Sequence, residues 1–435
     1  MTGPEHPPSS EHAMKLNALV CFSLITFVSA LNPASLAQTY SVIHEFSVTG
    51  NSWDGAAPYG GVILSAGALY GTTSRGGNGP ALGPGTAYQM THVGSDWTFT
   101  PILVLPATNL GGYQPWARVV FGPDDHLYGT TGGGGANNGG VVFDLTPPVS
   151  ICMTVDCLWT ENVLYNFASS NEAGPRYGDL IWDQQGNIYG TTLEGGVNNK
   201  GTVYQLTPSG NGWQENILHS FDGLDGFLPY AGVVFDNKGN LWGTTAYGGV
   251  DNDGTIFELT YVPGVGWQET VVYQFLGDNG GGVDEEYSFA GVVFDRAGNV
   301  YGVTNTGGPE NAGAVFELSP SGKTYTFKVL YRLPAVSPNC GPSASLTLDA
   351  AGNLYGTTLC SGAYQFGNVF KLSNTPNGWV YSSLHDFAGP PDDGSMPISQ
   401  VTIDTDGTLY GTTTQGGSSP YCLSFGCGVV WMIKP

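Results

Sequence analysis

A five-residue phrase recurs seven times along this chain, and its spacing constrains the fold more than any other feature. The copies start at intervals of 53 to 61 residues. They read LYGTT at 69–73, 127–131, 354–358 and 409–413, IYGTT at 188–192, LWGTT at 241–245 and VYGVT at 300–304. Self-similarity at one period of this size, in a chain rich in Gly, Thr, Tyr and Val, predicts a β-propeller or a solenoid.

Each repeat contains four apolar runs separated by turn-forming residues. In the fourth repeat the first run is 232–236, and the turn that follows it, 236–240, has Gly and Asn, which tolerate the positive φ of a tight hairpin. The recurring phrase is the second run, 255–260 is the third, and the fourth run, 267–275, starts at an aromatic residue. One repeat therefore predicts one four-stranded antiparallel blade.

The number of strands distinguishes a closed ring from an open array. The sequence predicts seven first, second and third strands, but six fourth strands, which start at Trp97, Trp159, Trp213, Trp267, Tyr325 and Trp379. A further strand is predicted at 40–46, and the seventh repeat ends after its third strand at 428–433. We therefore expect an all-β, seven-bladed β-propeller in which Val42 and Ile43 pair antiparallel with 429–433. Closure removes exposed sheet edges, whereas a solenoid would need capping repeats.

These repeats resemble those of a family of bacterial exported proteins with tandem GloVer repeats. The family is marked by D-x-x-G-N-L-Y-G-T-T, followed by G-G and then G-T-V-F-x-L, and the resemblance covers nearly all of residues 40–435. It implies an exported location and no particular reaction. Many members carry a C-terminal sorting or anchoring segment, but here the last blade runs to 433–435, so we expect no surface anchor of that kind.

Residues 1–37 have the features of a secretory signal peptide. Lys15 is followed by an apolar run at 16–30, and small residues at 35 and 37 precede Gln38. The polar residues before Met14 do not belong in such a signal, so Met14 is the expected start of translation. No other segment approaches the roughly 18 apolar residues of a membrane span. We expect residues 38–435 to form one propeller domain, exported to the periplasm or the extracellular space without membrane insertion.

The charge balance excludes some partners. Without residues 1–37 the chain has 33 acidic residues (35 minus 2) and 11 basic ones (12 minus 1), a net charge of about −22. Nucleic-acid binding needs clustered Lys and Arg to neutralise phosphates, and the sequence has no such cluster. The same argument disfavours an anionic membrane surface. A strongly negative protein stays soluble and attracts divalent cations.

Six cysteines follow the signal, and an even number in an exported protein predicts disulfides. Six cysteines allow 15 pairings, of which local spacing favours Cys152 with Cys157, Cys340 with Cys360, and Cys422 with Cys427. Cys340 precedes the first strand of the sixth repeat and Cys360 follows its second strand. Antiparallel pairing should bring their Cα atoms within about 7 Å. No Cys-x-x-Cys occurs, which disfavours a thiolate zinc site.

One repeat position is a candidate binding site. Directly before the first strand, five repeats have an aromatic residue: Tyr59, Trp116, Tyr177, Tyr230 and Phe289; the other two have Ser343 and Ile398. First strands line the channel of a propeller, so these rings are expected to surround its mouth, where aromatic faces can stack on sugar rings. The longer loops of the same face are acidic, with Asp54, Asp222, Asp225, Asp251, Asp253, Asp284, Glu285, Glu286, Asp392 and Asp393. The alternative is that the rings pack between blades.

Other chemically suggestive residues have structural interpretations. The Tyr of the recurring phrase is expected to pack between blades. His44, His219 and His385 share the fourth-strand position that holds Tyr165, Tyr273 and Tyr331 in other repeats, so we interpret them as packing residues. His126 is placed in a tight turn on the opposite face. Asp251 and Asp253 resemble part of a calcium loop but lack its later Glu, so calcium is an alternative to a solvated turn, and no other cofactor is indicated.

The sequence favours a binding protein over an enzyme. It contains no Gly-x-Ser-x-Gly elbow, His-Glu-x-x-His, P-loop or dinucleotide fingerprint. We therefore expect a non-catalytic exported module that binds a glycan or another surface or extracellular polymer. One alternative is a polysaccharide lyase or glycoside hydrolase, which would use paired carboxylates, and another is a structural or matrix protein without a defined ligand. Two acids, or an acid and a His, converging at the channel mouth would favour the enzyme.

Overall fold

The computed structural model describes residues 38–48, 54–77, 83–106, 111–148, 158–168, 174–210, 212–276, 290–307, 311–334, 340–422 and 425–435. The chain divides into two compact units, Met1–Ala37 and Gln38–Pro435. The first unit, which includes the predicted signal peptide, lies outside the described residues. Those residues contain strands and turns but no α-helix, and hence no helix that could cross a membrane.

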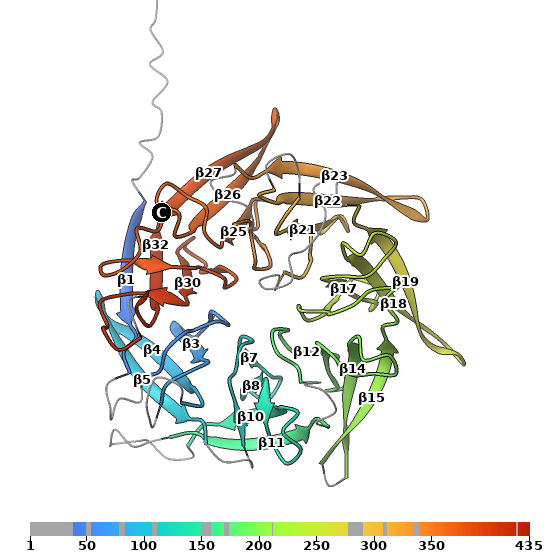
Figure 1. Cartoon of the computed structure of the whole chain (residues 1–435), viewed down its shortest axis with the longest axis horizontal. Coiled ribbons are helices and arrows are strands. Elements are labelled where there is room, and N and C mark those ends of the chain that lie inside the picture. The colour runs from blue at the N-terminus through green and yellow to red at the C-terminus, as the bar shows by residue number, and fades with distance from the viewer. Residues whose placement is uncertain are drawn as a thin grey trace, which may run out of the picture. The chain divides into compact units, whose positions relative to one another are not determined.

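The second unit is a seven-bladed β-propeller of four-stranded antiparallel sheets, as predicted (Figure 1). Two short ladders supplement the blades: β6 (Gly112–Tyr113) with β9 (Gly133–Gly134), and β28 (Gly394–Ser395) with β31 (Gln415–Gly416). From the innermost strand outward, blade 1 is β2 (Val62–Ser65), β3 (Ala68–Thr73), β4 (Thr86–Val93) and β5 (Asp96–Val104); blade 2 is β7 (Val120–Phe121), β8 (Leu127–Thr130), β10 (Val141–Thr146) and β11 (Thr160–Asn166); blade 3 is β12 (Ile181–Trp182), β13 (Ile188–Thr192), β14 (Thr202–Ser209) and β15 (Gly212–Ser220); blade 4 is β16 (Val234–Phe235), β17 (Leu241–Thr245), β18 (Thr255–Val262) and β19 (Gly266–Gln274); blade 5 is β20 (Val293–Phe294), β21 (Val300–Thr304), β22 (Ala314–Ser321) and β23 (Thr324–Arg332); blade 6 is β24 (Thr347–Leu348), β25 (Leu354–Thr358), β26 (Asn368–Thr375) and β27 (Gly378–Asp386); blade 7 is β29 (Thr402–Ile403), β30 (Leu409–Thr413), β32 (Val429–Lys434) and β1 (Thr39–Glu45).

The N-terminal strand closes the ring, which confirms the prediction from the strand count. β1 pairs antiparallel with β32, and Tyr40 lies opposite Ile433 and Val42 opposite Trp431. In Figure 1 β1 runs along the outer edge of blade 7, beside β32. Thr412 of blade 7 also donates a 2.8 Å hydrogen bond to the carbonyl of Pro58, which leads into blade 1.

The glycine of the recurring phrase makes room for an aromatic ring of the neighbouring strand. Each of these glycines lies directly opposite a buried aromatic residue of the third strand, and a Cβ on the glycine would lie only 2.3–2.6 Å from that ring or its hydroxyl. Any larger residue would therefore displace the ring. The pairs are Gly71–Tyr88, Gly129–Phe143, Gly190–Tyr204, Gly243–Phe257, Gly302–Phe316, Gly356–Phe370 and Gly411–Trp431.

The phrase Tyr is structural, as expected. Its ring is buried in most blades, and in blade 6 the Tyr355 hydroxyl donates a 3.1 Å hydrogen bond to Asp349 of the preceding tight turn. Asp349 also accepts bonds from the backbone and side chain of Asn353. Burial acts to raise the pKa of Asp349, but these hydrogen bonds outweigh it and lower the pKa. The D-x-x-G-N-x-Y pattern is thus one turn held by one carboxylate.

The first Thr of the phrase joins neighbouring blades. Its hydroxyl donates to a carbonyl that precedes the first strand of the next blade, for example from Thr191 to Ala231 at 2.9 Å and from Thr357 to Ser399 at 3.2 Å. Blade 5 has Val303 at this position. The Thr130 hydroxyl of blade 2 is buried and has no hydrogen-bond partner among the described residues.

This difference predicts opposite outcomes for one substitution. Thr191→Val leaves the Ala231 carbonyl without its partner and is expected to lower the free energy of unfolding by about 1–3 kcal/mol. Thr130→Val removes an unpaired buried hydroxyl and is expected to be neutral or stabilising. Urea unfolding of both variants beside the wild type checks this. Equal losses in the two would show that the inter-blade bond contributes nothing measurable.

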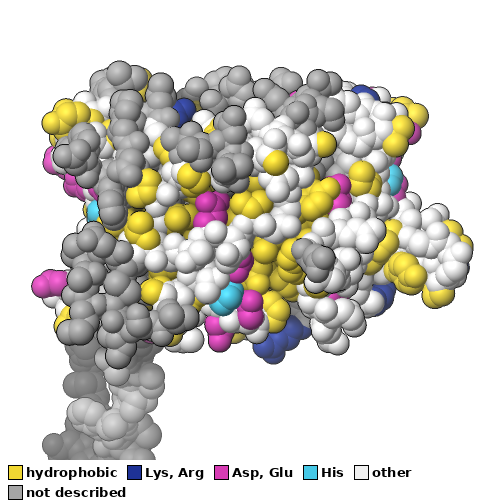
Figure 2. Space-filling model, turned by 90° about the horizontal axis from the view of Figure 1, so that it is seen from below, with side chains coloured by type: hydrophobic (Ala, Val, Ile, Leu, Met, Phe, Trp, Pro, Cys, Tyr) yellow, Lys and Arg dark blue, Asp and Glu magenta, His cyan; other side chains and the backbone are white. Residues whose placement is uncertain are grey.

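Apolar side chains pack between adjacent blades rather than in one central core. Between blades 3 and 4, for example, Tyr189 and Val203 pack against Val233, Leu241 and Phe257. The innermost strands are therefore left to line the middle of the ring. On the side of the molecule seen in Figure 2, carboxylates and apolar side chains are interspersed and few Lys or Arg side chains appear.

Candidate functional site

The first strands enclose a cavity of about 280 Å³ in the middle of the ring. Its lining comes from all seven blades, from residues that precede or begin the first strand. Four of the predicted aromatic residues belong to this lining or lie beside it: Tyr59, Trp116, Tyr177 and Tyr230. The predicted position, at the channel, is therefore where the structure has its cavity.

The four rings form a continuous arc over blades 1 to 4, and each is partly exposed. Trp116 stacks on Tyr177 with ring centroids 5.1 Å apart and an interplanar angle of 12°, and Tyr177 stacks on Tyr230 at 5.4 Å and 29°. Tyr59 lies 6.5 Å from Trp116 at a tilt of 55°. The rings thus pack on one another along the arc while part of each remains open to solvent.

The aromatic arc does not extend to blades 6 and 7. Ser343 and Ile398 are buried there, and the Ser343 hydroxyl accepts a 2.8 Å hydrogen bond from the Asn305 side chain. Phe289 of blade 5 lies outside the described residues. The described aromatic residues therefore occupy one side of the channel.

An ion pair crosses the same side of the channel. Arg118 donates from Nε and Nη2 to Asp179, at 3.0 and 2.7 Å, and its backbone N–H donates to the other oxygen of that carboxylate. The Arg176 guanidinium lies 5.1 Å from the centre of the Trp116 ring, in the range of a cation–π contact. Burial raises the pKa of Tyr177, so its hydroxyl stays protonated and can donate a hydrogen bond.

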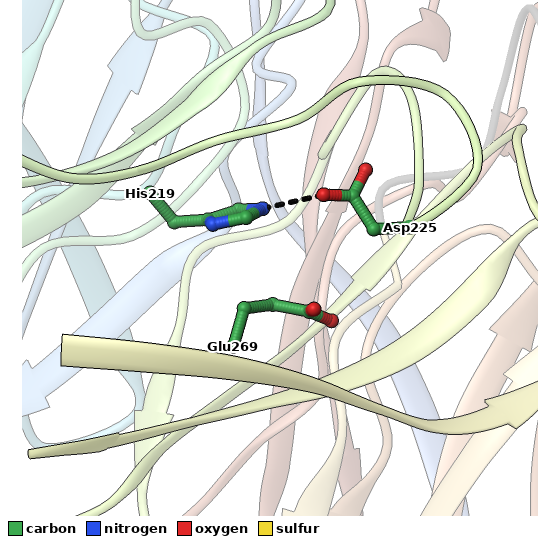
Figure 3. Close-up of side chains that lie close together, drawn as sticks. All are labelled: His219, Asp225 and Glu269. Atoms are coloured by element: carbon green, nitrogen blue, oxygen red, sulfur yellow. Dashed lines mark hydrogen bonds and ion pairs between the residues drawn. The ribbon is translucent and has the colours of Figure 1, made fainter.

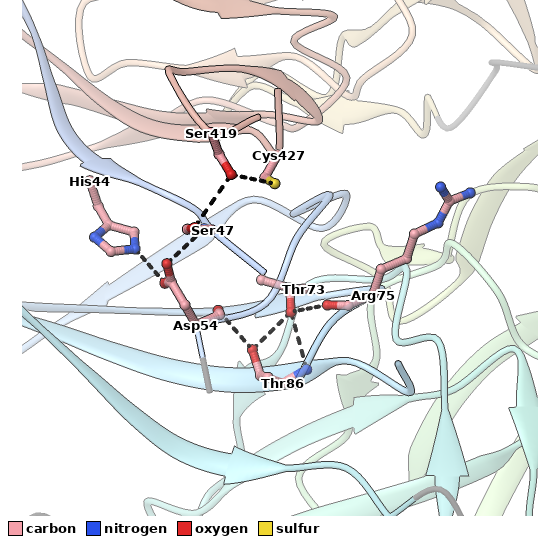
Figure 4. A network of polar contacts seen from close by, with 8 residues as sticks. All are labelled: His44, Ser47, Asp54, Thr73, Arg75, Thr86, Ser419 and Cys427. Atoms are coloured by element: carbon pink, nitrogen blue, oxygen red, sulfur yellow. Dashed lines mark hydrogen bonds and ion pairs between the residues drawn. The ribbon is translucent and has the colours of Figure 1, made fainter. Parts of the chain in front are cut away.

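The acidic loops do not line this cavity, contrary to what the sequence suggested for residues next to the aromatic ring. Asp179 is the only carboxylate in the described lining. Asp54, Asp225 and Asp393 are turned outward and pair with histidines (Figure 4 for Asp54). The Asp222 carboxylate accepts from the backbone of its own loop. Asp284, Glu285 and Glu286 lie outside the described residues.

The three fourth-strand histidines each bond one aspartate. The Nε2 atoms of His44, His219 and His385 lie 2.7, 2.8 and 2.9 Å from Asp54, Asp225 and Asp393. A bulge one residue before each histidine shifts the register of the strand, and re-aims the side chain. The Asp54 carboxylate also accepts from the backbone of Ser47, which fixes the loop (Figure 4).

Sequence reasoning missed these pairs, although a signal for them exists. The three repeats with a histidine are also the three whose next loop reads Asp-Gly-x-x-Pro, at 54–58, 225–229 and 393–397. The packing interpretation is correct for His44, which stacks on Phe99 at 4.1 Å, and for His385, which stacks on Tyr40 at 3.5 Å. His126 lies in the tight turn before β8, and its Nδ1 is 2.9 Å from Asp144.

The sequence description of the Gloeobacter/Verrucomicrobia repeat matches this chain twice, over residues 28–234 and 176–425. The chain belongs to this family. The match confirms the resemblance to GloVer-repeat proteins, and the structure shows that seven Gloeobacter/Verrucomicrobia repeats form seven blades. No curated protein matches the chain.

Several solved structures are similar to this propeller. A protein of unknown function from Dyadobacter fermentans is 12% identical with a TM-score of 0.43, and the match covers 91% of this chain and 98% of that one. A putative oxidoreductase (glucose dehydrogenase) from Thermus thermophilus is 18% identical with a TM-score of 0.43, covering 75% and 98%. A gluconolactonase from Xanthomonas campestris is 11% identical with a TM-score of 0.40, covering 91% and 95%. Similarity at this level carries no information about function.

One His–Asp pair of the repeats has a third partner. Glu269 of β19 lies beside His219 and Asp225, and one ligand atom from each of the three lies within 4.8 Å of the other two (Figure 3). Burial raises the pKa of Glu269 to about 7; His219 lowers it, and Asp225 and Asp222 raise it. This is the one such group of three His, Cys, Asp or Glu side chains in the described part of the chain.

The calcium alternative at Asp251 and Asp253 stays a prediction. Asp251 is exposed in the loop between β17 and β18. The side chain of Asn252, between the two acids, accepts a 3.2 Å hydrogen bond from the backbone of Gly248, and Asn252 has φ of 64°. These are features of a closed turn, and a turn of this kind needs no ion to hold it.

Two of the three predicted disulfides are present. Cys340 and Cys360 are bonded with Cα atoms 4.6 Å apart, within the predicted 7 Å, and Cys422 and Cys427 with Cα atoms 5.1 Å apart. The third predicted pair, Cys152 with Cys157, lies outside the described residues. The first bond joins the two ends of a hairpin in blade 6, and the second closes the loop before β32.

Proposed function

We propose that this protein is an exported, non-catalytic propeller that binds a glycan or another hydroxyl-rich surface polymer in its central channel. The aromatic arc carries the proposal: four partly exposed rings, from Tyr59 to Tyr230, lie at the edge of one cavity. Rings that served only to pack between blades would be buried. Partly exposed rings beside a cavity are the arrangement that stacks on the apolar faces of sugars.

Polar groups around the arc suit the hydroxyls of such a ligand. The ion pair with Asp179 uses two of the five N–H donors of Arg118. Gln400 and Ser345 line the cavity from the opposite blades. Fixed donors and acceptors around an apolar platform orient a ligand that has many hydroxyl groups.

The size of the cavity favours recognition of a short stretch of polymer. Ligand pockets usually have volumes of about 300–1,000 Å³, and this cavity of about 280 Å³ is near the lower limit. It therefore suits one sugar ring or the end of a chain.

The carboxylates favour binding over hydrolysis. Most glycoside hydrolases use two carboxyl groups that flank the scissile bond. In the described lining the Asp179 carboxylate stands alone, and it is already paired with Arg118. No histidine belongs to the described lining, so the converging acids or acid–His pair expected of an enzyme is not there.

Export is supported by the two disulfides, because such bonds persist in oxidising compartments. The predicted secretory signal at residues 1–37 leads to the same location, the periplasm or the extracellular space.

A glycan array probed with the purified protein, with calcium and with EDTA, tests the proposal. The wild type should bind one group of related glycans, and the double variant Tyr177→Ala, Tyr230→Ala should bind them about ten- to a hundredfold more weakly, a loss of roughly 1–3 kcal/mol. Tyr364→Ala is the matched control, because Tyr364 is 60% exposed and does not line the cavity. This control should bind like the wild type.

Two results would contradict the proposal. No binding to any glycan by the wild type would favour a structural or matrix role, and equal binding by the double variant would place the site elsewhere. Calorimetric unfolding of the double variant shows whether it folds. A loss of several kcal/mol of stability with unchanged glycan binding would assign the rings to packing.

A further inference from the structure

One repeat position recurs at every boundary between blades. The fourth-strand residue after the bulge, the one that is His or Tyr in six blades, faces the third position of the fourth strand in the next blade. That second position holds Phe99, Glu161, Glu215, Glu269, Phe327, Tyr381 and Tyr40. The seven boundaries are thus seven versions of one contact, and they can be compared with one another.

At two of the three histidine boundaries the facing residue is an aromatic ring that covers the imidazole. Tyr40 lies on His385 with ring centroids 3.5 Å apart and an interplanar angle of 6°, and Phe99 lies on His44 at 4.1 Å and 7°. In both cases the histidine has an aspartate on Nε2 and a ring on its face. These two boundaries show what purely structural versions of the contact look like.

At the third histidine boundary the facing residue is a carboxylate. Glu269 takes the place of the ring and lies beside the His219–Asp225 pair (Figure 3). Its Oε1 atom is buried and has no hydrogen-bond partner in the described part of the chain. The preceding boundary shows what such a glutamate does otherwise: Glu215 accepts a 3.0 Å hydrogen bond from Tyr165. Glu269 faces an imidazole whose Nε2 is already bonded to Asp225.

We propose that His219, Asp225 and Glu269 bind one divalent transition-metal ion, Zn²⁺ being the best match, between blades 3 and 4. One imidazole nitrogen with two carboxylate oxygens is a ligand set that Zn²⁺ accepts, whereas Ca²⁺ and Mg²⁺ are bound by oxygen ligands. The three side chains come from β15, the loop that follows it, and β19. Bound there, the ion joins the outer strands of two blades.

The distances allow this with a small change. Zinc–ligand bonds of about 2.0–2.2 Å require ligand atoms that are no more than about 4.2 Å apart. The three atoms lie within 4.8 Å of one another, so a rotation about the flexible Glu269 side chain completes the set. The ion would offset the mutual repulsion of two carboxylates and give Oε1 a partner. None of the three residues lines the channel, so this site is independent of the proposed glycan site.

Titration of tag-free, EDTA-treated protein with ZnCl₂ in a calorimeter tests the proposal. The wild type should bind Zn²⁺ and should have a higher melting temperature with Zn²⁺ than with EDTA. Glu269→Gln, which keeps the shape of the side chain but removes its charge, should bind Zn²⁺ at least tenfold more weakly. Glu215→Gln is the matched control at the same repeat position, and it should bind Zn²⁺ like the wild type.

A second variant tests the comparison between boundaries. Glu269→Tyr reproduces the aromatic residue that Tyr40 provides over His385, so it should stay folded, with a melting temperature that no longer depends on Zn²⁺. A crystal of the wild type soaked in ZnCl₂ should show an anomalous peak within about 2.3 Å of all three side chains. No peak there, or equal Zn²⁺ binding by the wild type and Glu269→Gln, would overturn the proposal, whatever the stability of the variants.

Discussion

Removal of residues 38–47 is expected to lower the melting temperature sharply and to turn a monodisperse protein into one that associates. The deletion removes all of β1, which pairs with β32 along six residue pairs. The edge of β32 would then be exposed, and free sheet edges pair with other chains. It also removes Phe46, which is fully buried, and burial of one Phe alone contributes about 3–5 kcal/mol.

The same deletion releases both neighbours of blade 7. Towards blade 6 it removes Tyr40, which stacks on His385 and donates a hydrogen bond to Asp393. Towards blade 1 it removes His44 and Ser47, which hold the Asp54 carboxylate (Figure 4). The ring therefore loses its closure at two boundaries at once.

Calorimetry and size-exclusion chromatography check this prediction, with a chain that begins at Gln38 as the control. That control should unfold like the processed protein. The variant Phe46→Ala should have an intermediate stability because it keeps the strand and loses one ring. A deletion variant as stable and as monodisperse as the control would show that the seven blades do not depend on closure by β1.

The fold could be predicted almost completely because the seven repeats report on one another. A strand that is ambiguous in one repeat is clear in the next, so the missing fourth strand of blade 7 could be found by counting. The disulfide between Cys340 and Cys360 followed from the same reasoning, because its two ends flank one antiparallel hairpin. The position of the aromatic arc at the channel also followed from topology.

The side-chain contacts at the blade boundaries could not be predicted in this way. The His–Asp pairs depend on a one-residue bulge, and a bulge leaves no clear mark in an apolar run such as the one around Leu218. The paired residues are separated by 10, 6 and 8 positions in the three blades, so no fixed spacing reveals them. The acidic residues were correctly placed in loops, but whether a carboxylate points to the channel or to the rim depends on the path of the loop.

The glycine of the recurring phrase has a counterpart in the third strand, and substitution of both is expected to show it. Gly243→Ala should lower the free energy of unfolding by about 1–3 kcal/mol, because its Cβ would lie 2.5 Å from the Phe257 ring and the packed ring has nowhere to move. Phe257→Ala should cost about 3–5 kcal/mol, because Phe257 is fully buried between blades 3 and 4.

The double variant separates steric conflict from a general intolerance of the strand. Once the ring is removed, the methyl group of Gly243→Ala enters space that the ring has left, so it should cost nothing or restore part of the stability, and a double-mutant cycle should give a coupling energy of about 1–3 kcal/mol. Gly212→Ala is the control: a Cβ at Gly212 would meet no atom within 4 Å, and its effect should be close to zero. Additive losses at 243 and 257 would contradict the idea that glycine is kept there for the ring. Because the same pair recurs in all seven blades, the result would also explain why the phrase and the aromatic residue of the third strand occur together in every repeat.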